Sequence, residues 1–495
     1  MPYPDASLEA IDTICNNAWK AFHEYRLLSL KQRADFMRAI AQKLDNADPS
    51  LISTAMAETH LPEARLRSEK ARTVFQLTSY AAACERGTWL DARIDTAITS
   101  KNPAQPDLRK TLTPLGPVVV FGASNFPFAY STAGGDTACA FAAGCPVIVK
   151  GHPAHAGTSQ MVANLILEAA RETHMPDHVF AHVHGSGFEV GKALVEHPRV
   201  KAVGFTGSFA GGKQLWDWAN ARPEPIPVFA EMGSINPVFL FPEKLEKATK
   251  EIADMYAASV TTSVGQFCTN PGLIIGVESE ALSKFIDILG EGIAATPPAD
   301  MLHAGIAKAY AEKRKNALSQ DQVTEVAESR NASEGAQGIA TIATAPASAF
   351  LGNPVLHQEV FGPYSIVIQC RDLTEMYNLA MKLEGQLTTS LMATDQDIQQ
   401  NPALVEAIKN IAGRFIMNGV PTGVTVALSM QHGGPYPATT DSRWSAVGAD
   451  GIKRFARPVC YQNWSDYLLP DELKNANPLG IWRTVNDILT KDAVQ

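Results

Sequence analysis

Five short apolar runs, each separated from the next by a helical stretch bounded by Gly or Pro, most constrain the fold of this chain. They are residues 118–121, 147–149, 179–183, 202–205 and 228–230. Strands that alternate with helices in this way predict a doubly wound parallel sheet, whose ligands bind at the carboxyl ends of the strands. We therefore expect an α/β fold with candidate site residues directly after these strands, namely Asn125, Lys150, Gly207, Ser208 and Glu231.

The charge pattern excludes some classes of partner. The formal net charge is −9 and no block of like charge occurs, so we expect neither nucleic acid nor a membrane surface as a partner. Residues 111–149 contain one charged side chain, Asp136, but Gly and Pro interrupt them repeatedly. No uninterrupted apolar span of about 20 residues exists there, so we interpret the stretch as the buried centre of the sheet.

The cysteines indicate a reducing compartment. The seven are scattered, odd in number, and contain neither a C-x-x-C pair nor a His/Cys cluster at metal-ligand spacing. We therefore expect a cytoplasmic protein without a bound metal. The first residues also lack the basic start and apolar core of a secretory signal.

A chain of 495 residues is too long for one core, so several parts are expected. We predict a cofactor-binding domain of residues 1–90 and 114–232, with a largely helical beginning, and a catalytic domain of residues 233–430. Short β-prone polar pieces in residues 91–113 suit an oligomerisation arm, which we group with a C-terminal tail of residues 431–495.

Cys268 lies in a loop of small and amide residues between a helical run and the apolar strand 273–277. Such a loop can present a thiol in a cleft, where a nucleophile belongs. The alternative is a buried cysteine that packs as a small hydrophobe, which is the usual state of a free thiol. The loop alone does not decide between the two.

Two other strand-end residues carry chemistry. A carboxylate desolvated at the position of Glu231 would have a raised pKa and could act as a general base, although a capping or ion-paired glutamate fits equally well. Asn125 offers an amide donor that could help to hold an oxyanion, or could be a simple turn residue. Residues 204–208, Gly-Phe-Thr-Gly-Ser, would let a pyrophosphate approach a helix N-terminus.

Taken together, these features are far more specific. Asn125 in Ser-Asn-Phe-Pro, Lys150, residues 204–208, Glu231, the Gly-Gln-Phe-Cys loop at Cys268, and Glu-Val-Phe-Gly-Pro at 359–363 occur in one order. Over nearly the whole chain this resembles the NAD(P)-dependent aldehyde dehydrogenases. The resemblance implies their fold: a Rossmann-like parallel-sheet cofactor domain, an α/β catalytic domain and a β oligomerisation arm.

The resemblance also implies a role for each matching residue. Cys268 would attack the aldehyde carbonyl, with the oxyanion held by Asn125 and the Cys268 N–H, and Glu231 would activate the hydrolytic water. The cofactor would be bound by Lys150 at the adenosine ribose, by Glu359 at the nicotinamide ribose, and by a further set consisting of Phe205, Gly207, Ser208, Gly212, Met232 and Phe361.

One departure bears on the cofactor. Family members that prefer NAD commonly carry an acidic residue three positions after this lysine, whereas here Lys150 is followed by Gly-His-Pro-Ala-His. Without that carboxylate nothing repels a 2′-phosphate, which Lys150 and His152 could bind. NADP is therefore the expected cofactor, with NAD as a second possibility.

Three stretches, residues 150–159, 432–443 and 457–464, are similar to one branch of the family, the 2,5-dioxopentanoate (α-ketoglutaric semialdehyde) dehydrogenases. That branch implies a cation for the substrate carboxylate, for which Arg443 is a candidate, although a structural salt bridge would explain it too. The alternative is an NADP-linked fatty aldehyde dehydrogenase with an apolar tunnel lined by residues such as Phe126, Phe128 and Phe267. His432 could assist proton transfer, or could simply orient its loop.

A catalytically silent relative with a structural or binding role is the alternative of a different class. Intact Cys268, Glu231 and Asn125 argue against it. The expected assembly is a homodimer or homotetramer, and the expected partner is a small aldehyde.

Overall fold

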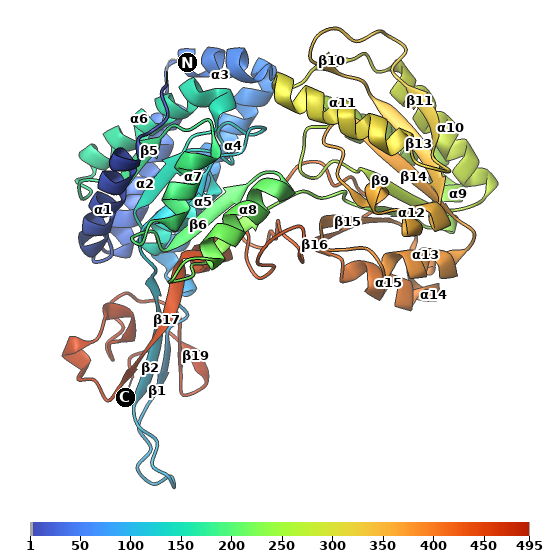
Figure 1. Ribbon diagram of the computed structural model, residues 1–495. Coiled ribbons are helices and arrows are strands. Elements are labelled where there is room, and N and C mark those ends of the chain that lie inside the picture. Colours follow the sequence, from blue (N-terminus) through green and yellow to red (C-terminus); the bar gives the residue numbers. More distant parts are fainter. Residues whose placement is uncertain (1–2, 495) are drawn as a thin grey trace.

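The computed structural model describes residues 3–494 of the chain. Two parallel-type sheets lie side by side, and a separate β arm projects away from both (Figure 1). The predicted α/β fold is confirmed.

The first sheet is the doubly wound sheet that the apolar runs predict. Its strands have the order β5-β4-β3-β6-β7 and all pair in parallel. They are β3 (Val118–Phe121), β4 (Val147–Lys150), β5 (Phe180–Val183), β6 (Ala202–Thr206) and β7 (Val228–Glu231). The connecting helices are α5 (Gly135–Ala143), α6 (Ala156–Glu172), α7 (Phe188–Glu196) and α8 (Phe209–Asn220). Since β3 and α5 are completely buried, the stretch with few charges is the centre of this domain.

Four N-terminal helices cover this sheet. They are α1 (Leu8–Tyr25), α2 (Leu30–Asp45), α3 (Ser50–Thr59) and α4 (Glu63–Arg86). Ser29 and Gln32 form a reciprocal capping box at the start of α2. The apolar faces of α2 and α4 share one core with α5 and β3, in which Phe36 packs against Phe141 with ring centroids 4.9 Å apart. The helical character of the first 90 residues was predicted, but α4 was not identified as a separate helix.

The second sheet has seven strands in the order β11-β13-β14-β9-β8-β15-β16, and only the edge strand β11 is antiparallel. The strands are β8 (Val238–Leu240), β9 (Leu273–Val277), β11 (Thr324–Glu328), β13 (Thr341–Pro346), β14 (Tyr364–Cys370), β15 (Gln386–Met392) and β16 (Ala412–Met417). A separate pair consists of β10 (Ala299–Asp300) and β12 (Gln337–Gly338). The helices are α9 (Pro242–Thr261), α10 (Glu280–Ala295), α11 (Ala304–Leu318), α12 (Ala347–Gly352), α13 (Leu373–Ala380), α14 (Asp395–Gln400) and α15 (Pro402–Lys409).

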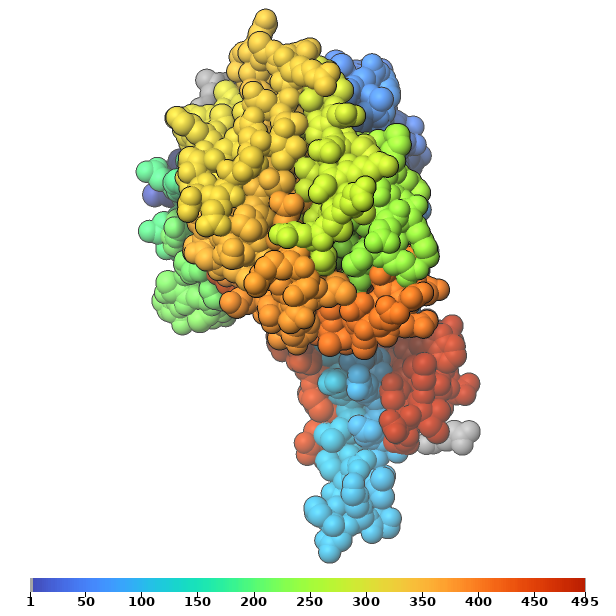
Figure 2. All heavy atoms as spheres, turned by 90° about the vertical axis from the view of Figure 1, so that its right-hand side faces the viewer, coloured from blue at the N-terminus to red at the C-terminus, as the bar shows by residue number. Residues whose placement is uncertain are grey.

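The arm is a five-stranded sheet built from two distant parts of the chain. Its strands are β1 (Arg93–Asp95), β2 (Leu108–Pro114), β17 (Ala456–Gln462), β18 (Arg483–Val485) and β19 (Ile488–Thr490). β17, from the C-terminal part of the chain, pairs antiparallel along the whole of β2. In Figure 2 the blue and red segments of this arm project together below the body of the molecule.

The predicted segment 431–495 divides in the structure. Only its part from β17 onward joins the arm, because Thr440 exchanges hydrogen bonds with Ala230 of β7 and Ala438 accepts one from Met232. Ala438 and Thr440 therefore lie beside the first sheet, whereas Gly434 and Tyr436 lie beside the start of β15 in the second. With that change we keep the three-part division as a proposal. Among residues 3–494, no helix is long and apolar enough to cross a membrane.

Candidate active site

A strained turn precedes the loop that carries Cys268 and fixes its direction. After α9, Ser263 and Val264 both have left-handed backbone angles, with φ of 51° and 56°, which a β-branched residue rarely adopts. Gly265 follows with φ of 62°, and a Cβ there would lie 2.2 Å from the carbonyl oxygen of Gly362. Only glycine fits this position.

Side-chain amides hold the loop in place. Asn236, just before β8, donates from Nδ2 to the carbonyl oxygens of Cys268 at 2.8 Å and Asn270 at 2.9 Å. Asn125, after β3, donates from Nδ2 to the carbonyl oxygen of Gln266 at 3.2 Å. Because an amide nitrogen carries two hydrogens, Asn125 keeps a second donor beside the cysteine.

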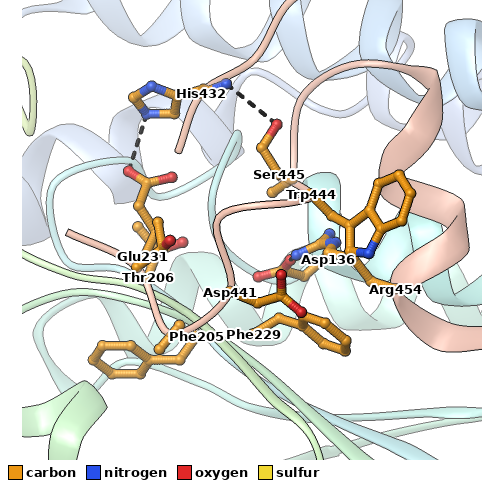
Figure 3. A pocket seen from close by; sticks show the side chains of 13 residues that line it. Asp136, Phe205, Thr206, Phe229, Glu231, His432, Asp441, Trp444, Ser445 and Arg454 are labelled. Atoms are coloured by element: carbon orange, nitrogen blue, oxygen red, sulfur yellow. Dashed lines mark hydrogen bonds and ion pairs between the residues drawn. The ribbon is translucent and has the colours of Figure 1, made fainter. Parts of the chain in front are cut away.

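Three residues from distant parts of the chain meet at this point. Nε2 of His432 lies 2.9 Å from Oε1 of Glu231 and 3.5 Å from Sγ of Cys268. Figure 3 shows the His432 ring and the Glu231 carboxylate pointing toward one another. Both residues are buried, so the imidazole can exchange a proton with the thiol or with the carboxylate out of contact with bulk water. Their ligand atoms are also close enough to one another to hold a metal ion, although no metal was expected from the sequence.

Burial raises the pKa of the Cys268 thiol well above its ordinary value, and the negative charge of Glu231 raises it further. The resting thiol is therefore protonated, and a base must remove its proton before it can attack. Glu231 and His432 are the two basic groups within reach.

A small cavity of about 20 Å³ lies behind Glu231 and is about large enough for one water molecule. Asp136 and Arg454 line it and form an ion pair at 2.7 Å (Figure 3). The one charged side chain of residues 111–149 is thus neutralised by a buried arginine. Ser445, on the same wall, accepts a hydrogen bond from the backbone N–H of His432 at 3.3 Å.

A larger cavity of about 410 Å³ reaches Cys268 from one side. One wall comes from the first domain and includes Gly207, Ser208 and Gly211 at the N-terminus of α8; the opposite wall comes from α11. Most of the predicted cofactor residues line it, namely His152, Phe205, Gly207, Ser208, Met232, Glu359 and Phe361.

This cavity fits a dinucleotide. The small residues at the start of α8 would let a pyrophosphate approach the helix N-terminus, and the Glu359 carboxylate could accept hydrogen bonds from ribose hydroxyls. Burial raises the pKa of the Glu359 carboxyl to about 7, against the charge of Lys313 and a hydrogen bond from the N–H of Ser234.

Three predicted cofactor residues differ from expectation in detail. Lys150 ends β4 near this cavity, but its side chain is not among those that line it. Gly212 does not line the cavity either; a Cβ there would meet Met232 at 2.6 Å, so its small size serves packing. Burial and the neighbouring His155 lower the pKa of His152 well below its ordinary value, so this imidazole is neutral.

A second cavity of about 260 Å³ reaches Cys268 from the other side. Its aromatic walls are Phe126, Tyr130 and Phe267. Successive turns of α4 add the polar side chains Arg65, Ser68, Glu69 and Arg72. Cys268 is thus placed between a cofactor-sized cavity and a smaller one with cationic side chains.

Two predicted substrate residues are elsewhere. Phe128 is wholly buried in the hydrophobic core of the first domain and does not line the cavity. The Arg443 side chain is mostly exposed and pairs with Asp441, and it lines neither cavity that reaches Cys268. The salt-bridge interpretation of Arg443 is the one that fits.

Sequence reasoning missed the residues on α4, Asn236 and the wall formed by α11. For Arg65 and Arg72 a signal existed, since two arginines seven residues apart lie on one helix face. Nothing in the sequence indicated which cavity that face would meet.

The chain is similar to known proteins over nearly its whole length. The sequence model described as "Aldehyde dehydrogenase family" matches residues 1–449. The chain is 47% identical over 474 residues to "Alpha-ketoglutaric semialdehyde dehydrogenase 2" of Azospirillum brasilense, covering 96% of this chain and 90% of the relative. It is 44% identical over 492 residues to "Alpha-ketoglutaric semialdehyde dehydrogenase" of Acinetobacter baylyi, covering 99% of this chain and 93% of the relative.

Solved structures share the fold at lower identity. A succinic semialdehyde dehydrogenase from Streptococcus pyogenes, in complex with NADP⁺, has a TM-score of 0.76 at 16% identity, covering 93% of this chain and 96% of that one. A Thermus 1-pyrroline-5-carboxylate dehydrogenase with bound NAD has a TM-score of 0.76 at 19% identity, covering 93% and 86%.

Proposed function

The chain belongs to the aldehyde dehydrogenase family, and on that premise we propose that it oxidises 2,5-dioxopentanoate (α-ketoglutaric semialdehyde) to 2-oxoglutarate with NADP, or with NAD, as the oxidant. The observation that carries the proposal is the position of Cys268 between a dinucleotide-sized cavity and a smaller one that contains arginines. The substrate follows from the two relatives of that name, which cover nearly the whole chain.

The first step is attack of Cys268 on the aldehyde carbonyl. Glu231 or His432 takes the thiol proton, and the sulfur forms a thiohemiacetal. The developing oxyanion is held by the free N–H of the Asn125 amide and by the N–H of Cys268. The residues that line the larger cavity would hold a nicotinamide dinucleotide, which would supply the hydride acceptor for the oxidation.

The residues of the chain then complete the turnover. Collapse of the thiohemiacetal leaves a thioester on Cys268, and a water deprotonated by Glu231 attacks it. The carboxylate product leaves, and the thiolate regains a proton. His432, between the sulfur and the carboxylate, can pass protons between them.

In the proposed cofactor site Gly207 and Ser208 would bind the pyrophosphate, Glu359 would bind the nicotinamide ribose, and Phe361 would contact the nicotinamide. The preference for NADP rests on the lack of a carboxylate after Lys150. Because His152 is neutral, it would bind a 2′-phosphate through a hydrogen bond and would not add a positive charge.

We also propose a cytoplasmic homodimer or homotetramer. Supporting this are seven free cysteines and the exposed apolar side chains of the arm, among them Trp464, Tyr467 and Leu468.

The test is the initial rate of NADPH formation with 2,5-dioxopentanoate, hexanal and decanal, repeated with NAD. A kcat/KM at least about tenfold higher for the dioxo acid, equal to about 1.4 kcal/mol of transition-state preference, and abolished by Cys268→Ala, is the expected result. Preference for decanal would instead favour a fatty aldehyde dehydrogenase. No turnover of any aldehyde would favour the catalytically silent relative.

A further inference from the structure

We propose that Arg65 forms a carboxylate-binding subsite that selects aldehydes carrying a carboxylate at the opposite end. The identity of the acid rests on the proposed function. The geometry of the subsite is independent of it. Arg65 lies in the first turns of α4 and lines the cavity that opens on Cys268 from the side opposite the cofactor cavity.

The guanidinium of Arg65 is enclosed by aromatic rings. Its central carbon lies 5.1 Å from the ring centroid of Phe126 and 4.9 Å from that of Phe267. These contacts fix the plane of the guanidinium and shield it from water, which strengthens any ion pair it makes.

The guanidinium contacts the proposed catalytic residues and keeps an unpaired hydrogen-bond donor. Its Nη2 donates to the backbone carbonyl of Asn125 at 2.8 Å, which ties it to the residue proposed to hold the oxyanion. Its Nη1 is buried and has no hydrogen-bond partner among the described residues. Because a buried unpaired charged donor is costly, a ligand with an acceptor is its natural complement.

The other charged groups of the cavity leave one donor of Arg65 unused. Burial lowers the pKa of Arg65, and the charge of Glu69, one helical turn further along, opposes this change. Oε1 of Glu69 accepts from the backbone N–H groups of Phe128 and Ala129, and its side chain forms no direct ion pair with Arg65. Arg72 is satisfied by neutral acceptors, namely the carbonyl of Val424 and the hydroxyl of Tyr130. Of the two arginines that line this cavity, Arg65 is therefore the one with a buried donor left for a ligand.

A bidentate carboxylate suits a guanidinium better than it suits an ammonium. With its carboxylate on Arg65, an ω-oxo acid would direct its aldehyde toward Cys268, which lines the same cavity. An uncharged aldehyde of the same length gains nothing from this contact. The subsite thus replaces the role that sequence reasoning gave to Arg443.

The first experiment measures kcat/KM for 2,5-dioxopentanoate, 5-oxopentanoate and pentanal in the NADP-saturated enzyme and in Arg65→Met, Arg65→Lys and Arg67→Met. Arg67 is the matched control, because it is on the same helix but is exposed and paired with Glu63. We expect the acid-to-pentanal ratio to fall roughly 10- to 100-fold in Arg65→Met, less in Arg65→Lys, and not at all in Arg67→Met. Equal losses for acid and pentanal in both Arg65 variants would overturn the proposal.

The second experiment is independent of the natural substrate. Alkylation of Cys268 by anionic iodoacetate and by neutral iodoacetamide is followed on the Cys268 peptide by mass spectrometry. We expect Arg65→Met to lower the iodoacetate-to-iodoacetamide rate ratio at least about threefold, and Arg67→Met to leave it unchanged. An unchanged ratio in Arg65→Met would refute the subsite. A wild-type enzyme that prefers decanal but shows the Arg65-dependent ratio would refute the proposed substrate and leave the anion subsite in place.

Discussion

His432 and Glu231 are 201 positions apart in the sequence, yet Nε2 of the one lies 2.9 Å from Oε1 of the other. The same nitrogen faces the sulfur of Cys268 at 3.5 Å. One imidazole therefore contacts both the proposed nucleophile and the proposed general base, and this arrangement makes the chemistry of the site testable step by step.

Glu231→Gln should separate the two halves of the reaction. The amide cannot deprotonate water, so steady-state turnover should fall roughly 100-fold or more, whereas His432 can still take the thiol proton. Rapid-mixing measurements should then show a burst of NADPH approaching one equivalent per site, followed by a slow phase. A slow phase without any burst would mean that Glu231 is needed before the thioester forms.

The nucleophile should titrate at high pH in the resting enzyme. Because burial and Glu231 both raise the pKa of the Cys268 thiol, its alkylation by iodoacetamide should be slow at pH 7 and rise with pH. Glu231→Gln removes a negative charge, lowers the thiol pKa and should speed alkylation at a fixed pH. Asp441→Asn, which also removes a carboxylate from the neighbourhood of the small cavity, is the control. Slower alkylation in Glu231→Gln would show that Glu231 acts mainly as the base for the thiol.

Glu359 should give the cofactor-free protein a distinct pH dependence of stability. Its pKa is about 7 in the folded chain, against 4.5 for the ordinary group. Between these values the folded state binds more protons than the unfolded state, so the Glu359 contribution to stability is present below pH 4.5 and is lost as the pH rises toward 7. The Tm difference between Glu359→Gln and wild type should therefore grow in favour of the variant from pH 5 to pH 7. The exposed Glu312→Gln should show no such trend, and parallel Tm curves for Glu359→Gln and wild type would contradict the assignment.

Gly265→Ala should damage the catalytic loop. A methyl group there meets the Gly362 carbonyl and the backbone angle is unfavourable, so we expect a loss of about 2 kcal/mol or more of stability and a marked fall in kcat. Gly352→Ala is the matched control, because nothing lies within 4 Å of the added methyl. Thermal unfolding and initial rates of the two variants provide the comparison, and equal behaviour of the two would argue against a strained loop.

Local patterns in the sequence were sufficient for the parallel sheet. The five apolar runs became β3 to β7 with shifts of one residue at most at their ends, since burial on both faces leaves a strand few alternatives. The order of the motifs was enough to predict the family. The placement of Asn125, Glu231 and Cys268 around one point follows from that order, although their catalytic roles stay predictions.

The amino-acid sequence by itself determined the elements of this protein, the residue types at the strand ends and the family to which it belongs. Only the tertiary structure decided which arginines line the cavity beside Cys268, and that His432 contacts both Cys268 and Glu231. Arg443 and Arg65 are equally charged in the sequence; the fold leaves Arg443 exposed beside Asp441 and encloses Arg65 between Phe126 and Phe267. The physical reason is that helical and strand periodicity act over a few residues, whereas the walls of a cavity are set by packing between segments that lie hundreds of residues apart.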